Sequence, residues 1–391
     1  MAVAVKLGIE SLLKDPSLIK GRRVGIILNA ASRDAKGRLS VDLIYEYGGA
    51  KVSAVFGPQQ GFFGETQDNM VEWDSSTYPP YNIPLYSLYG KTRKPTIEML
   101  EGIDVLIFDV QDVGCRVYTY IWTMALAMEA AREADKEFIV LDRPNPIGGE
   151  CMEGPLLEPE FSSFVGLYPL PFRHGMTVGE IARYLNEEWR IGARLTVIPM
   201  EGWKRGLWFE ETGLTWYPTS ANMPTLDTVN IYPVTVALEG TNISEGRGTT
   251  RPFEIIGAPF IDEYALSKEL KGMGLHWVSF IPWRFIPMFQ KHGGRECGGI
   301  FLVINDKRRL RTFETAISII SSIRRLYPRQ FAWKEPPYEY IFDKPPIDVI
   351  FGTDKIRRWL EEEVPAQEIV REAEKPLREF ARIRKRYELY C

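Results

Sequence analysis

Short apolar runs alternate with longer amphipathic stretches along the first half of the chain. The apolar runs are rich in Val, Ile, Leu and Phe, and they lie at residues 24–28, 52–56, 104–108, 138–141 and 195–198. Apolar strands without polar alternation, separated by helical segments, are typical of a parallel sheet that is buried on both faces. The pattern therefore predicts an α/β fold with a Rossmann-like parallel sheet.

Amphipathic segments between these runs predict helices at residues 95–100, 119–134 and 177–189. The last helix has a capping box at its start, because Thr177 is followed three residues later by Glu180. These helices supply the crossover connections that a parallel sheet needs.

The pattern changes after about residue 250. Helices are predicted at residues 261–273 and 311–327, strands at 278–286 and 299–304, and a charged, helix-rich segment at 353–389. Pro252 and the segment 257–259 break the chain before these elements. We therefore predict a Rossmann-like domain over residues 1–255 and a smaller α+β domain over residues 256–391.

The composition restricts the kinds of molecule that we expect this protein to bind. The chain has 391 residues, of which 45% are hydrophobic, and this is enough to bury a large core. Its 48 basic and 52 acidic residues give a net charge of −4 and form no polycationic block, so we expect no nucleic-acid or membrane partner. The first ten residues lack the features of a signal peptide, and we expect a cytoplasmic protein, although exported relatives would carry a leader. Oligomeric state is left open by these features.

Polar side chains follow several of the apolar runs directly. Asn29, Gln59, Asp109 with Asp112, and Asp142 each stand where a predicted strand ends. The carboxyl ends of parallel strands meet at one edge of a sheet, and ligands bind at that edge. The sequence therefore predicts a cleft there, with turn or helix capping as the alternative role for each aspartate.

Five phrases, taken together, resemble one family. They are residues 57–65, 85–91, 108–114, 141–149 and 239–252, and the likeness runs from about residue 5 to residue 390. The chain resembles the bacterial exo-β-N-acetylmuramidases, first catalogued as a domain of unknown function. The resemblance implies a hydrolase that removes N-acetylmuramic acid from the non-reducing end of peptidoglycan fragments, in a cleft between the two domains. We expect a small saccharide or muropeptide as substrate and no cofactor or metal, since the three histidines are widely separated.

One departure from the family pattern concerns the chemistry. Many members carry Pro-Glu-His-Gly where this chain reads Pro58-Gln59-Gln60-Gly61. A neutral amide has no titratable proton near neutral pH, so Gln59 cannot act as a proton donor. Its predicted role is to hold a sugar hydroxyl or to orient a water molecule.

Glycoside hydrolysis ordinarily needs two carboxyl groups that flank the scissile bond. Glu65 is the nearest carboxyl to residue 59 and is the predicted replacement, with helix capping or loop fixing as its alternative role. Glu153 and Asp112 are the candidates for the second carboxyl. Glu153 is favoured because its glycine and proline neighbours imply a fixed loop.

Substrate-binding candidates come from the same phrases. Residues 241–251 combine arginines, glycines and hydroxyl residues, which suits an anionic, hydroxylated ligand. Arg247 or Arg251 is predicted to bind the lactyl carboxylate of N-acetylmuramic acid through its planar guanidinium, and the alternative is a turn fixed by an ion pair with Glu245. The remaining candidates are Gln59, Gln60, Asn29, Arg116, Asp142, Arg143, His174, Asn222 and Glu245.

Three hypotheses for the function follow. The first is an exo-acting glycosidase of peptidoglycan. The second is a catalytically silent sugar-binding homologue that kept the cleft and lost the acid. The third is a hydrolase of a different glycoside or of an ester, and no Gly-x-Ser-x-Gly motif supports a serine esterase.

Overall fold

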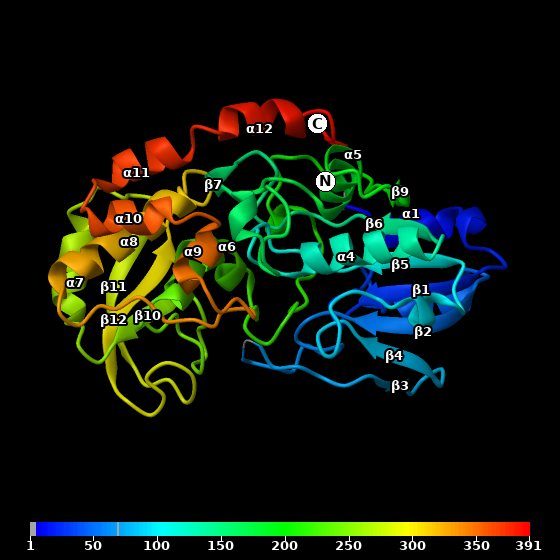
Figure 1. Ribbon diagram of the computed structural model, residues 1–391, viewed down its shortest axis with the longest axis horizontal. Coiled ribbons are helices and arrows are strands. Elements are labelled where there is room, and N and C mark those ends of the chain that lie inside the picture. Colours follow the sequence, from blue (N-terminus) through cyan, green and yellow to red (C-terminus); the bar gives the residue numbers. More distant parts are fainter. Residues whose placement is uncertain (1–4, 69) are drawn as a thin grey trace.

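The larger part of the fold is a seven-stranded sheet with the strand order β3-β4-β2-β1-β5-β6-β9 (Figure 1). The computed structural model describes residues 5–68 and 70–391. Every pairing in this sheet is parallel except that of β3 with β4, which confirms the predicted parallel sheet. The strands are β1 (Arg23–Leu28), β2 (Lys51–Gly57), β3 (Ser76–Tyr78), β4 (Ile83–Ser87), β5 (Val105–Asp109), β6 (Glu137–Leu141) and β9 (Arg194–Ile198).

Both faces of this sheet are buried, and neighbouring residues of one strand belong to different cores. On β5, Leu106 and Phe108 join one core, whereas Val105 and Ile107 join the other. The first core contains residues of α4 (Tyr120–Glu133) and α5 (Val178–Glu188), and α3 (Ile97–Leu100) packs beside α4. The second contains residues of α1 (Gly8–Lys14) and α2 (Ser40–Tyr47). Burial on both sides is the reason that these strands read as continuous apolar runs.

The C-terminal part is built on a three-stranded antiparallel sheet with the order β10-β12-β11. Its strands are β10 (Ile255–Ala258), β11 (Val278–Phe285) and β12 (Cys297–Ile304), and α7 (Glu263–Lys271) packs on β11 and β12. Before β10, α6 (Leu226–Thr235) packs against α8 (Thr312–Leu326) and continues into the 3₁₀ helix η4 (Val236–Gly240). A smaller α+β part is thus confirmed, while the boundary at residue 255 stays a prediction.

Shorter elements connect and cover these parts. A two-stranded ladder joins β7 (Glu153–Leu156) to β8 (Pro171–Arg173). The remaining helices are α9 (Pro346–Phe351), α10 (Lys355–Glu361), α11 (Ala366–Ala373), α12 (Leu377–Arg384), and the 3₁₀ turns η1 (Pro16–Leu18), η2 (Pro159–Phe161) and η3 (Phe209–Glu211). In the described residues, no helix combines the length and apolarity that a bilayer crossing requires.

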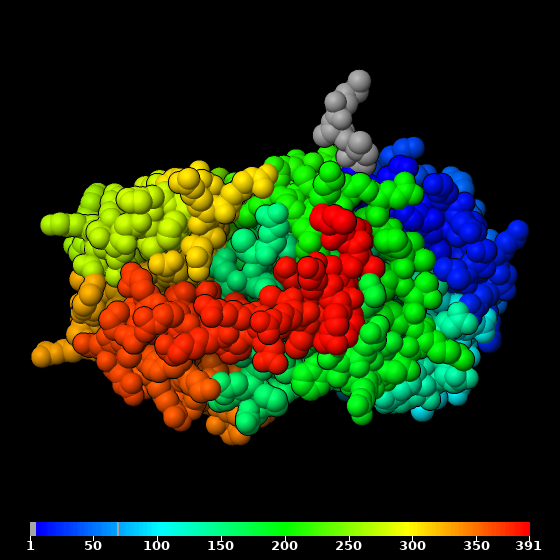
Figure 2. Space-filling model, turned by 90° about the horizontal axis from the view of Figure 1, so that it is seen from above, coloured from blue at the N-terminus to red at the C-terminus, as the bar shows by residue number. Residues whose placement is uncertain are grey.

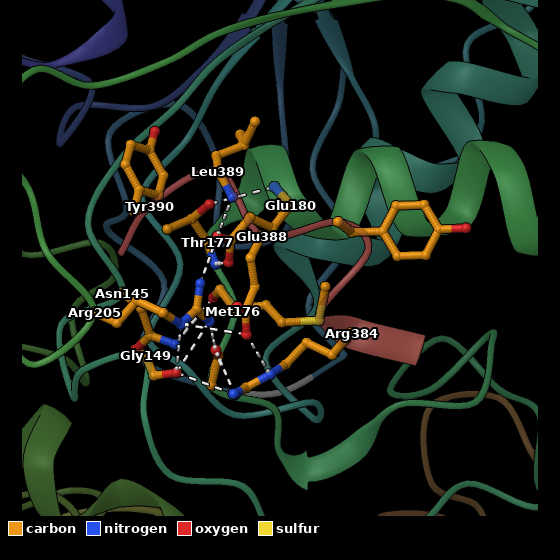
Figure 3. Close-up of polar contacts among 12 residues, drawn as sticks. Asn145, Gly149, Met176, Thr177, Glu180, Arg205, Arg384, Glu388, Leu389 and Tyr390 are labelled. Atoms are coloured by element: carbon orange, nitrogen blue, oxygen red, sulfur yellow. Dashed lines mark hydrogen bonds and ion pairs between the residues drawn. The ribbon is translucent and has the colours of Figure 1, made fainter. Parts of the chain in front are cut away.

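The C-terminal segment crosses back from the smaller part to the larger one. In Figures 1 and 2, α11 and α12 run over the top of the molecule from the C-terminal lobe to the region of α5. Beyond α12, the chain is fixed by polar contacts (Figure 3). Glu180 of the capping box accepts hydrogen bonds from Arg205 at 2.6 Å and from the backbone N–H of Leu389 at 2.9 Å. The carbonyl oxygens of Gly149 and Gly175 accept from both Arg205 and Arg384.

Tyr390 forms the last contact of this segment. Its hydroxyl donates to Asp142 Oδ2 at 2.6 Å and accepts from the backbone N–H of Met200 at 2.9 Å. Its ring packs edge-on against Trp203, with 5.0 Å between the centroids. The final residues therefore pack against the carboxyl end of β6, inside the larger part of the fold.

Replacing Tyr390 with Phe will lower the free energy of unfolding by about 1–3 kcal/mol, because the substitution removes one donor and one acceptor from buried partners. Urea unfolding followed by circular dichroism measures the change. Tyr264→Phe is the control, since Tyr264 is 69% exposed. Equal stability of the two variants would contradict an anchoring role for the Tyr390 hydroxyl.

Candidate active site

A pocket with about 450 Å³ of empty space lies between the larger sheet and the C-terminal part. Its wall includes the turn after β2, the residues before and at the start of α4, and segments around residues 220–223, 247–253 and 338–339. Two glutamates, Glu239 and Glu339, line the same pocket, and both are buried.

The carboxyl group of Glu339 is held by donors from the larger part of the fold. Gln59 Nε2 donates to Oε1 at 3.2 Å, and the hydroxyl of Tyr89 donates to Oε2 at 2.8 Å. Gln59 Oε1 in turn accepts from the hydroxyl of Thr119 at 2.5 Å, which fixes the orientation of the amide. Burial raises the pKa of Glu339, and the two hydrogen bonds offset only part of that effect. A carboxyl with a raised pKa keeps its proton to higher pH, as a general acid requires.

The carboxyl group of Glu239 has different neighbours. Arg247 Nη2 lies 2.6 Å from its Oε1, and the hydroxyl of Tyr338 donates to its Oε2 at 2.7 Å. Arg247 also lies 3.3 Å from Glu245, whose carboxylate accepts from Lys291 Nζ at 2.9 Å. A buried ion pair therefore faces the pocket beside a carboxyl group that burial favours in its protonated form.

Four residues in or beside the pocket that are not glycine have left-handed backbone conformations. They are Gln60, Phe253, Glu339 and Tyr340, with φ values of 74°, 64°, 44° and 65°. Such conformations cost about 1 kcal/mol or more for residues with a Cβ atom, and they are concentrated at functional sites in proteins. Gln60, Phe253 and Glu339 line the pocket.

Four of the sequence-predicted site residues line this pocket, namely Gln59, Gln60, Asn222 and Arg247. Asn222 donates to the backbone oxygen of Gln67 at 2.7 Å and so fixes the loop after β2. Asn29 is buried and donates to the backbone oxygen of Thr219 at 3.0 Å. The carboxyl ends of β1 and β2 thus contribute to the pocket and its support, as the strand pattern suggests.

The other predicted carboxylates lie outside the pocket wall. Glu153 forms a buried ion pair with Arg173 at 2.7 Å and accepts from the backbone N–H of Phe313 at 3.1 Å. Asp112 accepts from the backbone N–H of Gly114 at 2.7 Å and lies 3.1 Å from His174 Nε2. His174 Nδ1 accepts from the backbone N–H of Met176, so Nε2 carries the proton that is donated to Asp112. Glu65 is exposed.

Most of the remaining candidates have structural partners. Arg143 forms a buried bidentate pair with Asp109, at 2.5 and 2.9 Å. Arg116 is fully buried and donates to the backbone oxygens of Pro155, Leu170 and Ile350 at 2.9–3.0 Å, and burial lowers its pKa to about 10. Arg251 is half exposed and pairs with Glu254 at 3.0 Å. The predicted functional roles of these residues, and of Glu65, Glu153 and Asp112, stay predictions.

Comparison with known proteins accounts for nearly the whole chain. Residues 24–227 match the family model of the N-terminal domain of the exo-β-N-acetylmuramidase NamZ, and residues 230–390 match that of its C-terminal domain. The chain belongs to the NamZ family. The predicted family membership is thereby confirmed.

Relatives agree with this assignment. The peptidoglycan β-N-acetylmuramidase NamZ of Bacillus subtilis is 46% identical over 387 residues, which covers 99% of this chain and 91% of that protein. A crystal structure of a DUF1343 family protein from Bacteroides fragilis superposes with a TM-score of 0.89 at 34% identity over the full length of both chains. A second such protein from the same organism has a TM-score of 0.76 at 27% identity and covers 99% of both chains.

Within this NamZ family chain, sequence reasoning missed both pocket glutamates. Glu239 is the first residue of the phrase 239–252, in which the arginines were the predicted ligand-binding residues. Glu339 lies in Pro336-Pro337-Tyr338-Glu339-Tyr340, far from any strand end. The sequence signal that could have identified Glu339 is a carboxyl residue among prolines and aromatic residues. Such neighbours restrict its backbone and shield it from water.

Asp142 is buried among four donors, which are the backbone N–H groups of Arg143 and Gly179 and the hydroxyl groups of Thr177 and Tyr390. Burial nevertheless raises its pKa from 3.8 to about 7. A carboxyl group whose pKa is higher in the folded state binds protons more tightly there than in the unfolded chain. Its contribution to stability is therefore complete below about pH 4 and is lost as the pH rises through about 7.

The difference in unfolding free energy between the wild type and Asp142→Asn will therefore fall between pH 4 and pH 7, since asparagine does not titrate. Chemical denaturation at pH 4, 5, 6 and 7 measures this slope. Asp74→Asn, at an exposed position, provides the matched control and will show no such slope. A constant difference across this range would contradict the raised pKa of Asp142.

Proposed function

We propose that this protein is an exo-β-N-acetylmuramidase that removes N-acetylmuramic acid from the non-reducing end of peptidoglycan fragments. The observation that carries the proposal is the pair of buried glutamates, Glu239 and Glu339, in the wall of one pocket. Membership of the NamZ family supports the choice of substrate. Exo action is supported by the two matching family models, which are those of an exo-β-N-acetylmuramidase.

In this proposal Glu339 is the general acid. Its proton moves to the glycosidic oxygen as the bond from that oxygen to the anomeric carbon breaks, and a water molecule then adds to the anomeric carbon and gives its proton to the Glu339 carboxylate. Tyr89 and Gln59 hold the carboxyl group by its two oxygens, and its burial preserves the proton. Gln59 is then a positioning residue, and it needs no titratable proton of its own.

Glu239 is the second carboxylate. Its ion pair with Arg247 and its hydrogen bond from Tyr338 fix it in the pocket wall, where a negative charge stabilises the positive charge that develops on the sugar ring. Arg247 is accordingly proposed to position Glu239 and not to bind the lactyl carboxylate. The roles predicted for Glu65, Glu153 and Asp112 pass to the two pocket glutamates in this proposal.

The decisive test is release of free N-acetylmuramic acid from a β-linked N-acetylmuramic acid–N-acetylglucosamine disaccharide, followed by mass spectrometry. Glu339→Gln and Glu239→Gln will each lower kcat by about 10²–10⁴-fold, because each removes a group that acts in the transition state. Glu65→Gln and Glu153→Gln are the matched controls. Loss of activity in a control, with activity kept in Glu339→Gln, would contradict this assignment of the acid.

Tyr89→Phe tests the acid by its pH dependence. The hydrogen bond from Tyr89 lowers the pKa of Glu339, so its removal will raise that pKa further. An acid that must be protonated will then stay active to a higher pH, so the alkaline limb of the plot of kcat against pH will move to higher pH. A shift to lower pH, or an unchanged profile, would show that another group limits activity at high pH. Tyr264→Phe controls for the loss of a hydroxyl group.

A catalytically silent sugar-binding protein is the second candidate function. It is favoured by one observation: the pocket wall contains the amide of Gln59 where many family members are expected to carry a glutamate. A protein of this kind will bind N-acetylmuramic acid without cleaving the disaccharide. Gain of hydrolysis in Gln59→Glu, from an inactive wild type, would support it over the first proposal.

A further inference from the structure

Gln60 has an unsatisfied carboxamide in the pocket wall. Its Oε1 is buried and has no hydrogen-bond partner within residues 5–68 and 70–391, and its Nε2 makes no hydrogen bond in that part of the chain either. The residue lines the same pocket as Glu239 and Glu339. Buried polar atoms in folded proteins nearly always have partners, so an unpaired amide oxygen on a residue of the pocket wall indicates a ligand group that completes it.

The backbone conformation of Gln60 is a second indication that its side chain has a role in binding. Its φ of 74° lies in the left-handed region, which glycine adopts at no steric cost and glutamine does not. The turn that carries it is fixed on both sides, because Trp73 Nε1 donates to the backbone oxygen of Pro58 at 3.1 Å and Ala30 N–H donates to that of Phe62 at 2.7 Å. A rigid turn therefore presents a side chain at a position where glycine would be easier to accommodate.

The chemistry of the missing partner can be read from the carboxamide. The unpaired buried atom is the acceptor oxygen Oε1, so the group that completes it is a hydrogen-bond donor, and the N–H of an acetamido group is such a donor. A lactyl carboxylate offers acceptors only and would leave Oε1 unpaired. The pocket also contains apolar side chains that suit a methyl group, namely Val117, Val165, Met223 and Phe253.

We propose that Gln60 recognises the 2-acetamido group of the sugar, with its Oε1 accepting a hydrogen bond from the acetamido N–H. The inference rests on the proposed function for the identity of the sugar. It assigns Gln60 as the residue that selects sugars with a hydrogen-bond donor at position 2 over sugars without one. Selection of this kind is strong because a buried polar group is left unpaired when the wrong ligand binds.

Calorimetric titration with free sugars tests the proposal whether or not the protein is an active enzyme. The probes are N-acetylmuramic acid and its 2-deoxy counterpart, 3-O-(1-carboxyethyl)-2-deoxyglucose, which has no donor at position 2. Wild-type protein will bind the acetamido sugar at least tenfold more tightly. Gln60→Leu and Gln60→Gly will bring the ratio of the two dissociation constants close to one, mainly by weakening the binding of N-acetylmuramic acid.

A second variant at position 60 separates a binding defect from a folding defect, and an exposed glutamine provides the control. Gln60→Gly suits the left-handed backbone and will fold if Gln60→Leu does not. Gln367→Leu removes a carboxamide at an exposed position on α11 and will leave the ratio unchanged. An unchanged ratio in both Gln60 variants, or no preference in the wild type, would overturn the proposal.

Failure of the enzymatic proposal has a different signature. A protein that prefers the acetamido sugar through Gln60 but never cleaves the disaccharide would refute hydrolysis and retain the assignment of Gln60. A protein that releases N-acetylmuramic acid with the same ratio of dissociation constants in wild type and Gln60 variants would retain hydrolysis and refute the assignment. Absence of binding of both sugars to the wild type would overturn the assignment as well.

Discussion

The hydrogen bonds from Gln59 and Tyr89 to Glu339 are the constraint on which the pocket depends. The acceptor comes from the C-terminal part, whereas the donors follow β2 and β4 of the large sheet, 280 and 250 residues away in sequence. A carboxyl group without such donors would be costly to bury, because the lost contacts with water would have no replacement. The two parts of the fold must therefore meet in one arrangement for Glu339 to be buried, and this arrangement also forms the pocket.

Other buried charges support that arrangement without facing the pocket. Arg143 with Asp109 and Arg173 with Glu153 are paired at 2.5–2.7 Å, and Arg116 is bonded to three backbone oxygens. The first pair joins the loop after β6 to the carboxyl end of β5, and the second joins β7 to β8. The C-terminal segment adds a further contact, the hydrogen bond from the Tyr390 hydroxyl to Asp142. The candidate catalytic groups are thus supported by buried charged side chains whose own partners lie elsewhere in the fold.

Much of the fold could be predicted from local pattern. The apolar runs at 24–28 and 104–108 correspond to β1 and β5, and the capping box at Thr177 and Glu180 is present at the start of α5. These predictions succeed because hydrophobic period and helix capping are properties of neighbouring residues. The candidate site was only partly accessible in this way. Gln59 and Gln60 stand at a strand end and were found, whereas Glu239 and Glu339 lie in a 3₁₀ helix and a loop whose position no periodicity encodes.

The sequence by itself determined the elements, the class of fold and the family, because each depends on short patterns and ordered phrases along the chain. It also determined that residue 59 is an amide, which cannot donate a proton to a leaving group. Only the tertiary structure decided which carboxyl groups face the pocket. Glu153 and Asp112 resemble Glu339 as residues, but they pack against Arg173 and His174, while Glu339 is brought to Gln59 and Tyr89. A carboxyl group is made suitable for acid catalysis by the burial and hydrogen bonds around it, and contacts across the whole chain supply both.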